Sequence, residues 1–256
     1  MSSVLINFNS KVLTKGSPLP NPLGPDKLRL YGMRFCPFAQ RVQICLVKKS
    51  IPTEIVNIKP WNVPEWYFSK HPKGQFPVLE HHGAKEPIPE SAAICEYLDD
   101  LYPKNRILPS DPYEKVQQKL LFERLNGLAP SYFATMSLVK SDEGKKEKYE
   151  TLHKAIGEHE SSLKAKFFSG TSTPGFVDYM IYPNLQRVYW ITNIIADYPL
   201  SKTAFPGPEK YPKLTAWYKR MQELPEVRQS VPSDEHGIVY FDAYLKGSHD
   251  FYDYGL

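Results

Sequence analysis

The chain has 256 residues, which is enough for one large domain or two modest ones, each with its own hydrophobic core. The formal net charge is only +4 and no basic tract alternates with aromatic residues, so we expect no nucleic-acid partner. No stretch approaches the ~18 apolar residues of a membrane-spanning helix, so we also expect no stable membrane insertion.

The cysteine content points to a reducing compartment. The chain has three cysteines, an odd number, and no Asn-x-Ser/Thr sequon, which fits a secreted disulfide scaffold poorly. Residues 1–10 lack an early positive charge and a long apolar run, so they do not resemble a secretory signal. We therefore expect a cytoplasmic protein.

The first part of the chain predicts a small mixed sheet covered by helices. Residues 1–27 are rich in Pro, Gly, Asn and Ser and are interpreted as an N-terminal extension. Strand-like and helix-like segments then alternate over residues 28–103, in an order compatible with a thioredoxin-like domain. The expected elements are strand 28–31, helix 37–49, strand 53–58, short helix 64–69, strand 76–80, short strand 87–89 and a helix from Ser91.

Residues 111–256 are predicted to form an all-helical domain after a proline-flanked connector. Asp111 is a helix N-cap, Pro112 suits the first helical position, and Glu114 adds the carboxylate of a capping box. Further helices are expected at 145–168, 176–195 and 212–222. The fold class is therefore α/β plus all-α.

Cys36 is the strongest candidate for chemistry. It lies between the strand 28–31 and a helix that begins with Pro37, whose missing N–H loses nothing at the first helical position. Unpaired N–H groups and the positive end of the helix dipole favour a thiolate, and the pKa of such a cysteine can fall from about 8.5 to roughly 3.5–7.5. A buried, inert cysteine is the alternative interpretation.

Position 39 indicates which thiol chemistry Cys36 can perform. Dithiol oxidoreductases place a second cysteine three residues after the first, but this chain has Ala39. We therefore expect monothiol exchange, in which an external thiol completes the reaction. Cys45 should point away from Cys36 on the same helix, and Cys95 lies among apolar residues, so both are interpreted as packing residues.

Two further segments offer ligand-binding groups. A cis Phe76-Pro77 bond would leave the backbone of Phe76 able to pair with an extended peptide-like ligand, although the residues alone favour an ordinary trans proline. Glu90 and Ser91 begin a helix and could hold an α-amino acid group, or Ser91 could be a plain N-cap. His81 and His82 are expected in a solvated turn, and no zinc-like spacing predicts a metal site.

Two groups of aromatic residues in the second half of the chain need an interpretation. Tyr182, Tyr189 and Trp190 recur at helical spacing, which is usual for a core, but some of them could line an apolar pocket for a second substrate. The segment 237–256 is too rich in aromatic residues to remain in water. We expect it to fold back on the body of the protein.

The motifs together resemble the omega class of the glutathione transferases. The resemblance covers nearly the whole chain after the extension and rests on MRFCPFA around Cys36, PEW at 64–66, DPYEK at 111–115 and the terminal DYGL. It implies a thioredoxin-like domain followed by a helical domain, a homodimer, and glutathione as co-substrate. The activities that it implies are thiol transfer, dehydroascorbate reduction, reduction of S-conjugates and weak glutathione conjugation.

The resemblance also implies roles for individual residues. Cys36 would form the mixed disulfide with glutathione, and Phe38 would lie beside the tripeptide. Phe76, followed by Pro77, would offer its backbone to the cysteinyl part. Glu90 and Ser91 would hold the γ-glutamyl end.

The chain departs from the family pattern at two positions. Val63 replaces a lysine that would meet the glycyl carboxylate, so that contact falls to Lys59 or Lys73. Hydrogen bonds to charged groups are worth roughly 1.5–3 kcal/mol, so glutathione affinity depends on this compensation. Phe76 replaces a smaller residue, commonly valine. These departures motivate one rival function, a protein that keeps the fold but binds glutathione weakly. A second rival is a non-catalytic or membrane-interacting relative, because the chloride intracellular channel proteins resemble this fold and carry a similar CPF run followed by Gln-Arg.

Overall fold

The computed structural model describes residues 6–230, 233–248 and 250–256. The chain forms two compact units, which are described separately. Unit 1 comprises Met1–Arg106, Gln229–Pro232 and Tyr252–Leu256, and unit 2 comprises Ile107–Arg228 and Ser233–Phe251. The expected domain limits of 28–103 and 111–256 remain a prediction.

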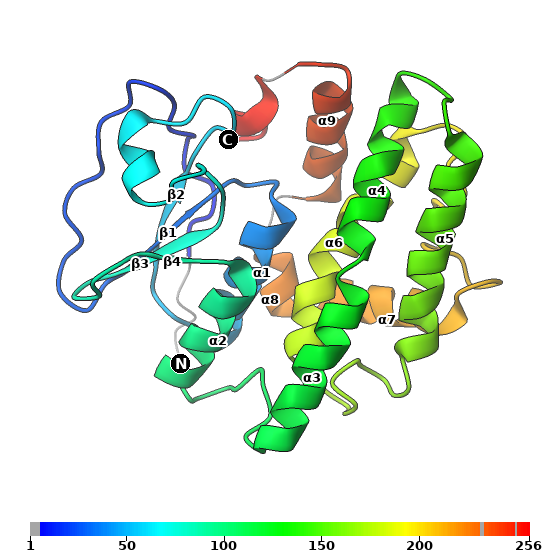
Figure 1. The fold of residues 1–256 in the computed structure, drawn as a ribbon, viewed down its shortest axis with the longest axis horizontal. Coiled ribbons are helices and arrows are strands. Elements are labelled where there is room, and N and C mark those ends of the chain that lie inside the picture. The colour runs from blue at the N-terminus through cyan, green and yellow to red at the C-terminus, as the bar shows by residue number, and fades with distance from the viewer. Residues whose placement is uncertain (1–5, 231–232, 249) are drawn as a thin grey trace. The chain divides into compact units, whose positions relative to one another are not determined.

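Unit 1 contains the expected mixed sheet, with strands in the order β2-β1-β3-β4 (Figure 1). β1 is parallel to β2 and antiparallel to β3, and β3 is antiparallel to β4. The elements are β1 (Leu28–Gly32), α1 (Pro37–Lys49), β2 (Glu54–Asn57), a 3-10 helix (Glu65–Ser69), β3 (Val78–His81), β4 (Ile88–Pro89) and α2 (Ser91–Leu101). The predicted order of strands and helices is confirmed, because the apolar runs and the Pro and Ser starts define these elements locally.

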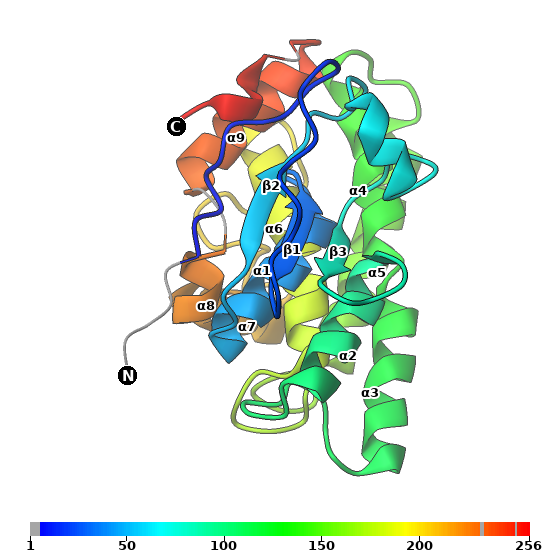
Figure 2. The same cartoon turned by 90° about the vertical axis from the view of Figure 1, so that its left-hand side faces the viewer.

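The N-terminal extension runs along the outer edge of β2, as Figure 2 shows. Leu13 forms a parallel bridge with Ile58, and its N–H donates to the carbonyl of Asn57 at 2.8 Å. The side-chain amide of Asn57 donates to the carbonyls of Phe8 and Ser10, both at 3.0 Å. The extension therefore covers a strand edge that would otherwise present unpaired backbone groups.

A buried ion pair joins the C-terminal end of α1 to α2. Lys49 Nζ lies 2.7 Å from Asp99 Oδ1, and both side chains have no solvent exposure. The same ammonium donates to the carbonyls of Lys104 at 3.1 Å and Asn105 at 3.3 Å. A buried charge without such partners is strongly destabilising, so this pair fixes how α1 and α2 pack.

Unit 2 is all-helical, as predicted. Its helices are α3 (Pro112–Leu125), α4 (Leu128–Met136), α5 (Lys145–Ser162), α6 (Phe176–Ile194), α7 (Pro212–Glu223), α8 (Pro225–Arg228) and α9 (Asp234–Leu245), with a 3-10 turn at Ser137–Val139. A further 3-10 turn, Phe251–Asp253, begins at the last residue of unit 2 and continues into the C-terminal residues of unit 1. Asp111 caps α3 as expected, because its carboxylate accepts the N–H of Glu114 at 2.9 Å. Among the described residues, no helix is both long enough and apolar enough to cross a bilayer.

The buried carboxylate of Asp178 organises the start of α6. It accepts hydrogen bonds from the backbone N–H groups of Phe168, Ser169 and Gly175, and from the indole of Trp217 at 2.7 Å. A Cβ on Gly175 would lie 2.9 Å from Cβ of Ser169, so the close approach favours glycine. The helix expected at 145–168 ends at Ser162, because the chain near residue 168 turns toward Asp178 instead.

The segment 237–256 folds back, as its aromatic content predicts. Tyr240 and Phe241 of α9 and Tyr252 are buried. Phe241 packs on Trp190, with ring centroids 5.4 Å apart, and a Cβ on Gly237 would lie only 2.3 Å from the Trp190 ring. Tyr182 and Trp190 are themselves fully buried, which supports the core interpretation for these two aromatics.

We expect Asp99→Asn to lower the free energy of unfolding by about 3–5 kcal/mol, because it leaves the buried Lys49 ammonium without its carboxylate. Asp100→Asn is the matched control, since Asp100 is exposed and its pair with Arg106 is a surface ion pair worth about 0–1 kcal/mol. Urea unfolding of both variants measures the difference. Equal destabilisation would contradict the assigned role of the pair.

We expect the stability of unit 2 to decrease in acid because of His159. Burial lowers the pKa of His159 from 6.5 to about 4, although Nδ1 donates to the carbonyl of Ala155 at 2.8 Å. Between these pKa values the unfolded chain binds the extra proton, so stability is lost as the pH falls, by up to about 3 kcal/mol. Unfolding of the wild type and of His159→Phe at pH 7 and pH 4 tests this. An equal loss in both proteins would exclude His159 as the cause.

Candidate functional site

Cys36 occupies the N-cap position of α1, as the sequence predicts. Pro37 begins the helix, the N–H of Cys36 donates to the carbonyl of Met33 at 3.0 Å, and the N–H of Gln40 donates to the carbonyl of Cys36 at 3.0 Å. Helix geometry leaves the N–H groups of Phe38 and Ala39 without acceptors inside the helix. Cys36 is 8% exposed, so its thiol lies at the positive end of the α1 dipole with limited access to water.

Tyr67 connects Cys36 with the segment that contains Phe76. Tyr67 is fully buried, its hydroxyl donates to the carbonyl of Gln75 at 2.8 Å, and its ring stacks on Phe76 at 5.5 Å. Burial raises the pKa of Tyr67, and the negative charges of Tyr31 and Cys36 raise it further. Tyr67 thus stays a neutral hydrogen-bond donor to the segment that precedes Phe76.

The Phe76-Pro77 peptide bond is cis. The residues alone favoured a trans proline at a strand start, and this expectation was wrong. β3 begins only at Val78, so the proline precedes the strand and takes no place in its hydrogen-bond ladder. The local sequence does not reveal the isomer, because tertiary packing selects it.

Glu90 and Ser91 lie at the start of α2 and differ in environment. Glu90 is exposed and has a φ of +67°, an unusual backbone conformation for a residue with a Cβ. Ser91 is buried, and its hydroxyl accepts a hydrogen bond from Arg41 Nη1 at 3.3 Å. A strained backbone conformation costs about 1–3 kcal/mol and persists only where the surrounding structure holds it in place. Such residues are concentrated at binding and active sites, which supports Glu90 as a site residue.

Arg41 and Tyr67 were missed as candidate residues. Arg41 is only 3% exposed, and its guanidinium carbon lies 5.0 Å from the centre of the Phe38 ring. Through the Ser91 hydrogen bond it joins Phe38 on α1 to the start of α2. An arginine within the apolar helix that follows Cys36 was the available sequence signal.

Lys59 lies beside the C-terminal segment. Its ammonium is 5.8 Å from the centre of the Tyr252 ring, and its backbone N–H donates to the carbonyl of Leu13 at 2.9 Å. Val63 belongs to an apolar cluster around Tyr31 and Tyr67, which gives a packing reason for valine at this position.

The other two cysteines are fully buried, in agreement with the packing interpretation. Burial raises the pKa of Cys95, and its contact with Cys45 raises it further. All three cysteines are free thiols. Among the described residues, no group of His, Cys, Asp or Glu side chains could hold a metal ion.

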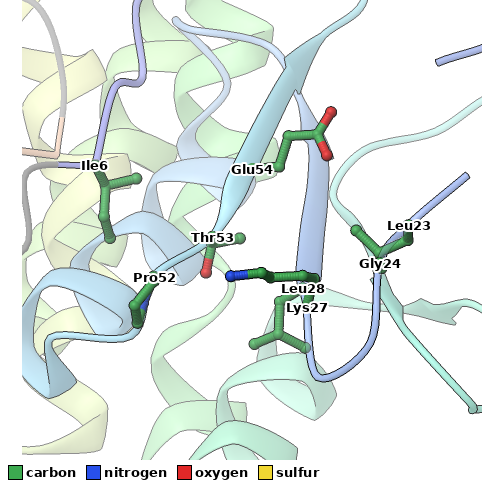
Figure 3. A pocket seen from close by; sticks show the side chains of 8 residues that line it. All are labelled: Ile6, Leu23, Gly24, Lys27, Leu28, Pro52, Thr53 and Glu54. Atoms are coloured by element: carbon green, nitrogen blue, oxygen red, sulfur yellow. The ribbon is translucent and has the colours of Figure 1, made fainter. Parts of the chain in front are cut away.

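A pocket of about 370 Å³ lies elsewhere on unit 1 (Figure 3). It lies between the extension and the start of β2 and is lined by Ile6, Leu23, Gly24, Lys27, Leu28, Pro52, Thr53 and Glu54. None of the predicted site residues lines it, so this hollow and the Cys36 neighbourhood are different places.

Comparison with protein families identifies two matching models. Residues 30–106 match the glutathione S-transferase N-terminal domain, and residues 142–220 match the glutathione S-transferase C-terminal domain. The first match contains Cys36, Phe76 and Glu90. The second lies within unit 2.

Known proteins similar over almost the full length include glutathione transferases of the omega class. A probable glutathione transferase omega-2 of Caenorhabditis briggsae is 50% identical, with 99% of each chain covered. Glutathione S-transferase omega-1 of Rattus norvegicus is 37% identical, covering 97% of this chain and 98% of its own. The crystal structure of glutathione transferase Omega 1C from Trametes versicolor has a TM-score of 0.71 at 23% identity, covering 87% of this chain and 98% of its own, which shows the shared fold.

We expect Glu90→Gly to raise the free energy of unfolding by about 1 kcal/mol, because glycine adopts the positive φ without strain. Glu96→Gly, inside the same helix, should instead lower it by about 1 kcal/mol. Thermal and urea unfolding of the two variants measures both signs. A loss of stability in Glu90→Gly would show that the conformation at Glu90 carries no strain.

Proposed function

Because this chain belongs to the omega class of the glutathione transferases, we propose that it is a glutathione-dependent thiol transferase and reductase with Cys36 as nucleophile. The observation that carries the proposal is the position of Cys36 at the N-terminus of α1, preceding Pro37 and without a second cysteine at position 39. The amide groups of Phe38 and Ala39 and the helix dipole stabilise the thiolate there.

The reaction proceeds by two thiol exchanges. The Cys36 thiolate attacks the glutathionyl sulfur of a mixed disulfide, forms a Cys36-glutathione disulfide and releases the other thiol, which takes up a proton. The thiolate of a second glutathione then attacks that disulfide, releases oxidised glutathione and restores Cys36. With dehydroascorbate, two glutathione molecules supply the two electrons and two protons, and ascorbate and oxidised glutathione are the products.

Glutathione, as co-substrate, is held by groups from four segments of unit 1. Phe38 lies beside the tripeptide, and the backbone of Phe76, preceding Pro77, pairs with its cysteinyl part. Glu90 and Ser91 bind the γ-glutamyl end, where the exposed carboxylate of Glu90 meets the ammonium and the N-terminus of α2 favours the carboxylate. Lys59 is assigned to the glycyl carboxylate in place of the absent lysine at position 63.

Arg41 supports this arrangement without being one of the predicted ligands. Its hydrogen bond to Ser91 and its position over Phe38 link the reactive helix to the γ-glutamyl site. We place the protein in the cytoplasm, where its three free cysteines stay reduced.

The protein is further proposed to be a homodimer. Tyr113, Val116 and Leu120 follow one face of α3 and are 72%, 50% and 58% exposed, which is unusual for side chains of this size. An apolar helix face of this kind is typical of a protein interface. A second copy of the chain fits it, since the resemblance to the omega class implies a homodimer.

Cys36→Ala should abolish glutathione-dependent reduction of dehydroascorbate and of a glutathionylated peptide, a fall of at least about 10³-fold, because no other group can form the mixed disulfide. Calorimetric titration with glutathione should still show binding to this variant. Cys95→Ala is the control that removes a buried thiol. Equal rates in wild type and Cys36→Ala would refute the nucleophile, and undetectable binding at millimolar glutathione in the wild type would favour the fold-retaining alternative.

Leu120→Lys should shift the protein toward the monomer in sedimentation velocity, because a charge would be buried in the apolar interface. We expect the dimer dissociation constant to rise at least about tenfold, equivalent to about 1.4 kcal/mol. Leu19→Lys is the control, since Leu19 is equally exposed but lies in the N-terminal extension. A monomeric wild type, or an effect of equal size in both variants, would argue against this interface.

A further inference from the structure

Arg34 is a buried arginine two residues before Cys36. It is 2% exposed and belongs to the turn that joins β1 to α1. Burial lowers its pKa, and the charge of Asp253 opposes this effect. A guanidinium has five N–H donors, and burying it without hydrogen-bond acceptors is destabilising. The fold therefore has to supply acceptors to Arg34.

The acceptors come from the two ends of the chain. Arg34 Nη1 donates to the carbonyl of Tyr254 at 2.9 Å and to that of Tyr252 at 3.2 Å, and Nε donates to Oδ1 of Asn9 at 3.2 Å. The side chain of Asp253 in turn accepts the N–H of Val12 at 3.0 Å. The C-terminal residues therefore belong to unit 1 and lie beside the N-terminal extension, as Figure 2 shows.

The same turn holds Cys36. The guanidinium carbon of Arg34 lies 5.3 Å from the centre of the buried Phe35 ring, and the N–H of Phe35 donates to Sδ of Met33 at 3.0 Å. The N–H of Cys36 donates to the carbonyl of Met33. A displacement of Arg34 would thus be transmitted through only two peptide units to the residue that caps α1.

On the other side of Cys36, α1 is tied to a second returning segment. Nε2 of Gln40 donates to the hydroxyl of Ser230 at 3.4 Å, and both residues are fully buried. Arg34 and Gln40 flank Cys36 in sequence, and each is bound to chain that comes from beyond residue 228. The reactive turn is therefore completed by residues distant in the sequence.

We infer that Arg34 is a positioning residue, which clamps the C-terminal segment Tyr252–Leu256 onto unit 1 and thereby holds Cys36 against the N-terminus of α1. The inference rests on the proposed function for its biological meaning, but the clamp acts on the thiol itself. Without it, the Cys36 sulfur is less well aligned with the helix N–H groups. The thiolate is then less favoured.

The test measures alkylation of Cys36 by iodoacetamide from pH 5 to pH 10, with the Cys36 peptide quantified by mass spectrometry. In Arg34→Met we expect the midpoint of the pH dependence of Cys36 alkylation to rise by about 0.5–1 pH unit. The alkylation rate at pH 7 should fall about 3–10-fold. Arg34→Lys should recover part of the loss, because an ammonium can still donate to the carbonyls of Tyr252 and Tyr254. Arg29→Met is the matched control: Arg29 is 3% exposed but pairs with Glu54 and Glu80 in the sheet.

A double-mutant cycle separates the clamp from a local effect of Arg34. A chain that ends at Phe251 should show the same change as Arg34→Met, and combining the two should add nothing, since the truncated chain has already lost the carbonyls of Tyr252 and Tyr254 that Arg34 holds. Asp253→Ala, which keeps the full chain, serves the same purpose if the truncated protein does not fold. Additive effects, an unchanged profile in Arg34→Met, or an equal shift in Arg29→Met would each overturn the inference.

The outcome is independent of the catalytic proposal. If Cys36→Ala retains full dehydroascorbate reductase activity, the proposed function fails, yet a shifted alkylation profile in Arg34→Met that is not additive with the truncation would still establish the clamp. If Cys36 is essential and the profile is unchanged, only the clamp fails. If Cys36 is the nucleophile and Arg34 is the clamp, the reductase activity of Arg34→Met at pH 7 should fall in parallel with the alkylation rate of Cys36.

Discussion

The N-terminal end of α1 has to satisfy two conditions at once. Its free N–H groups must face Cys36, and the polar side chains around it must be buried without being left unpaired. Arg34, Gln40 and Arg41 are all at most 3% exposed, and each donates a hydrogen bond to an acceptor distant in the sequence. These acceptors come from the C-terminal segment, from Ser230 and from Ser91. The arrangement of the chain around Cys36 therefore depends on residues that are distant in the sequence.

Buried polar groups fix the helices in the same way elsewhere in the protein. The Lys49–Asp99 pair holds α1 on α2, so the helix that presents Cys36 and the helix that begins at Ser91 are joined at both ends. In unit 2 the carboxylate of Asp178 brings Trp217 and the chain near residue 168 to the start of α6. Such pairs add little net stability compared with apolar packing, but removing one partner is costly, so they specify a single arrangement.

The departures from the omega pattern have physical explanations within unit 1. Val63 packs in the apolar cluster around Tyr67, where a lysine would bury its stem and have to extend its ammonium to water. Phe76 stacks on Tyr67, so the larger ring fills the same cluster. The ammonium of Lys59 lies beside Tyr252, so the group assigned to the glycyl carboxylate is also in contact with the C-terminal segment that Arg34 clamps.

The sequence by itself determined the elements whose signals are local: Pro37 and Asp111 mark helix starts, apolar periodicity gives α2 and α6, and Cys36 before Pro37 gives the reactive position. It also identified the family. The helices α4 and α9, the cis bond at Pro77 and the strained backbone of Glu90 were decided by tertiary structure. The roles of Arg34 and Arg41 were also decided by the tertiary structure. From the sequence alone each arginine is expected to be an exposed charge, because the residues that accept its hydrogen bonds are distant in the chain.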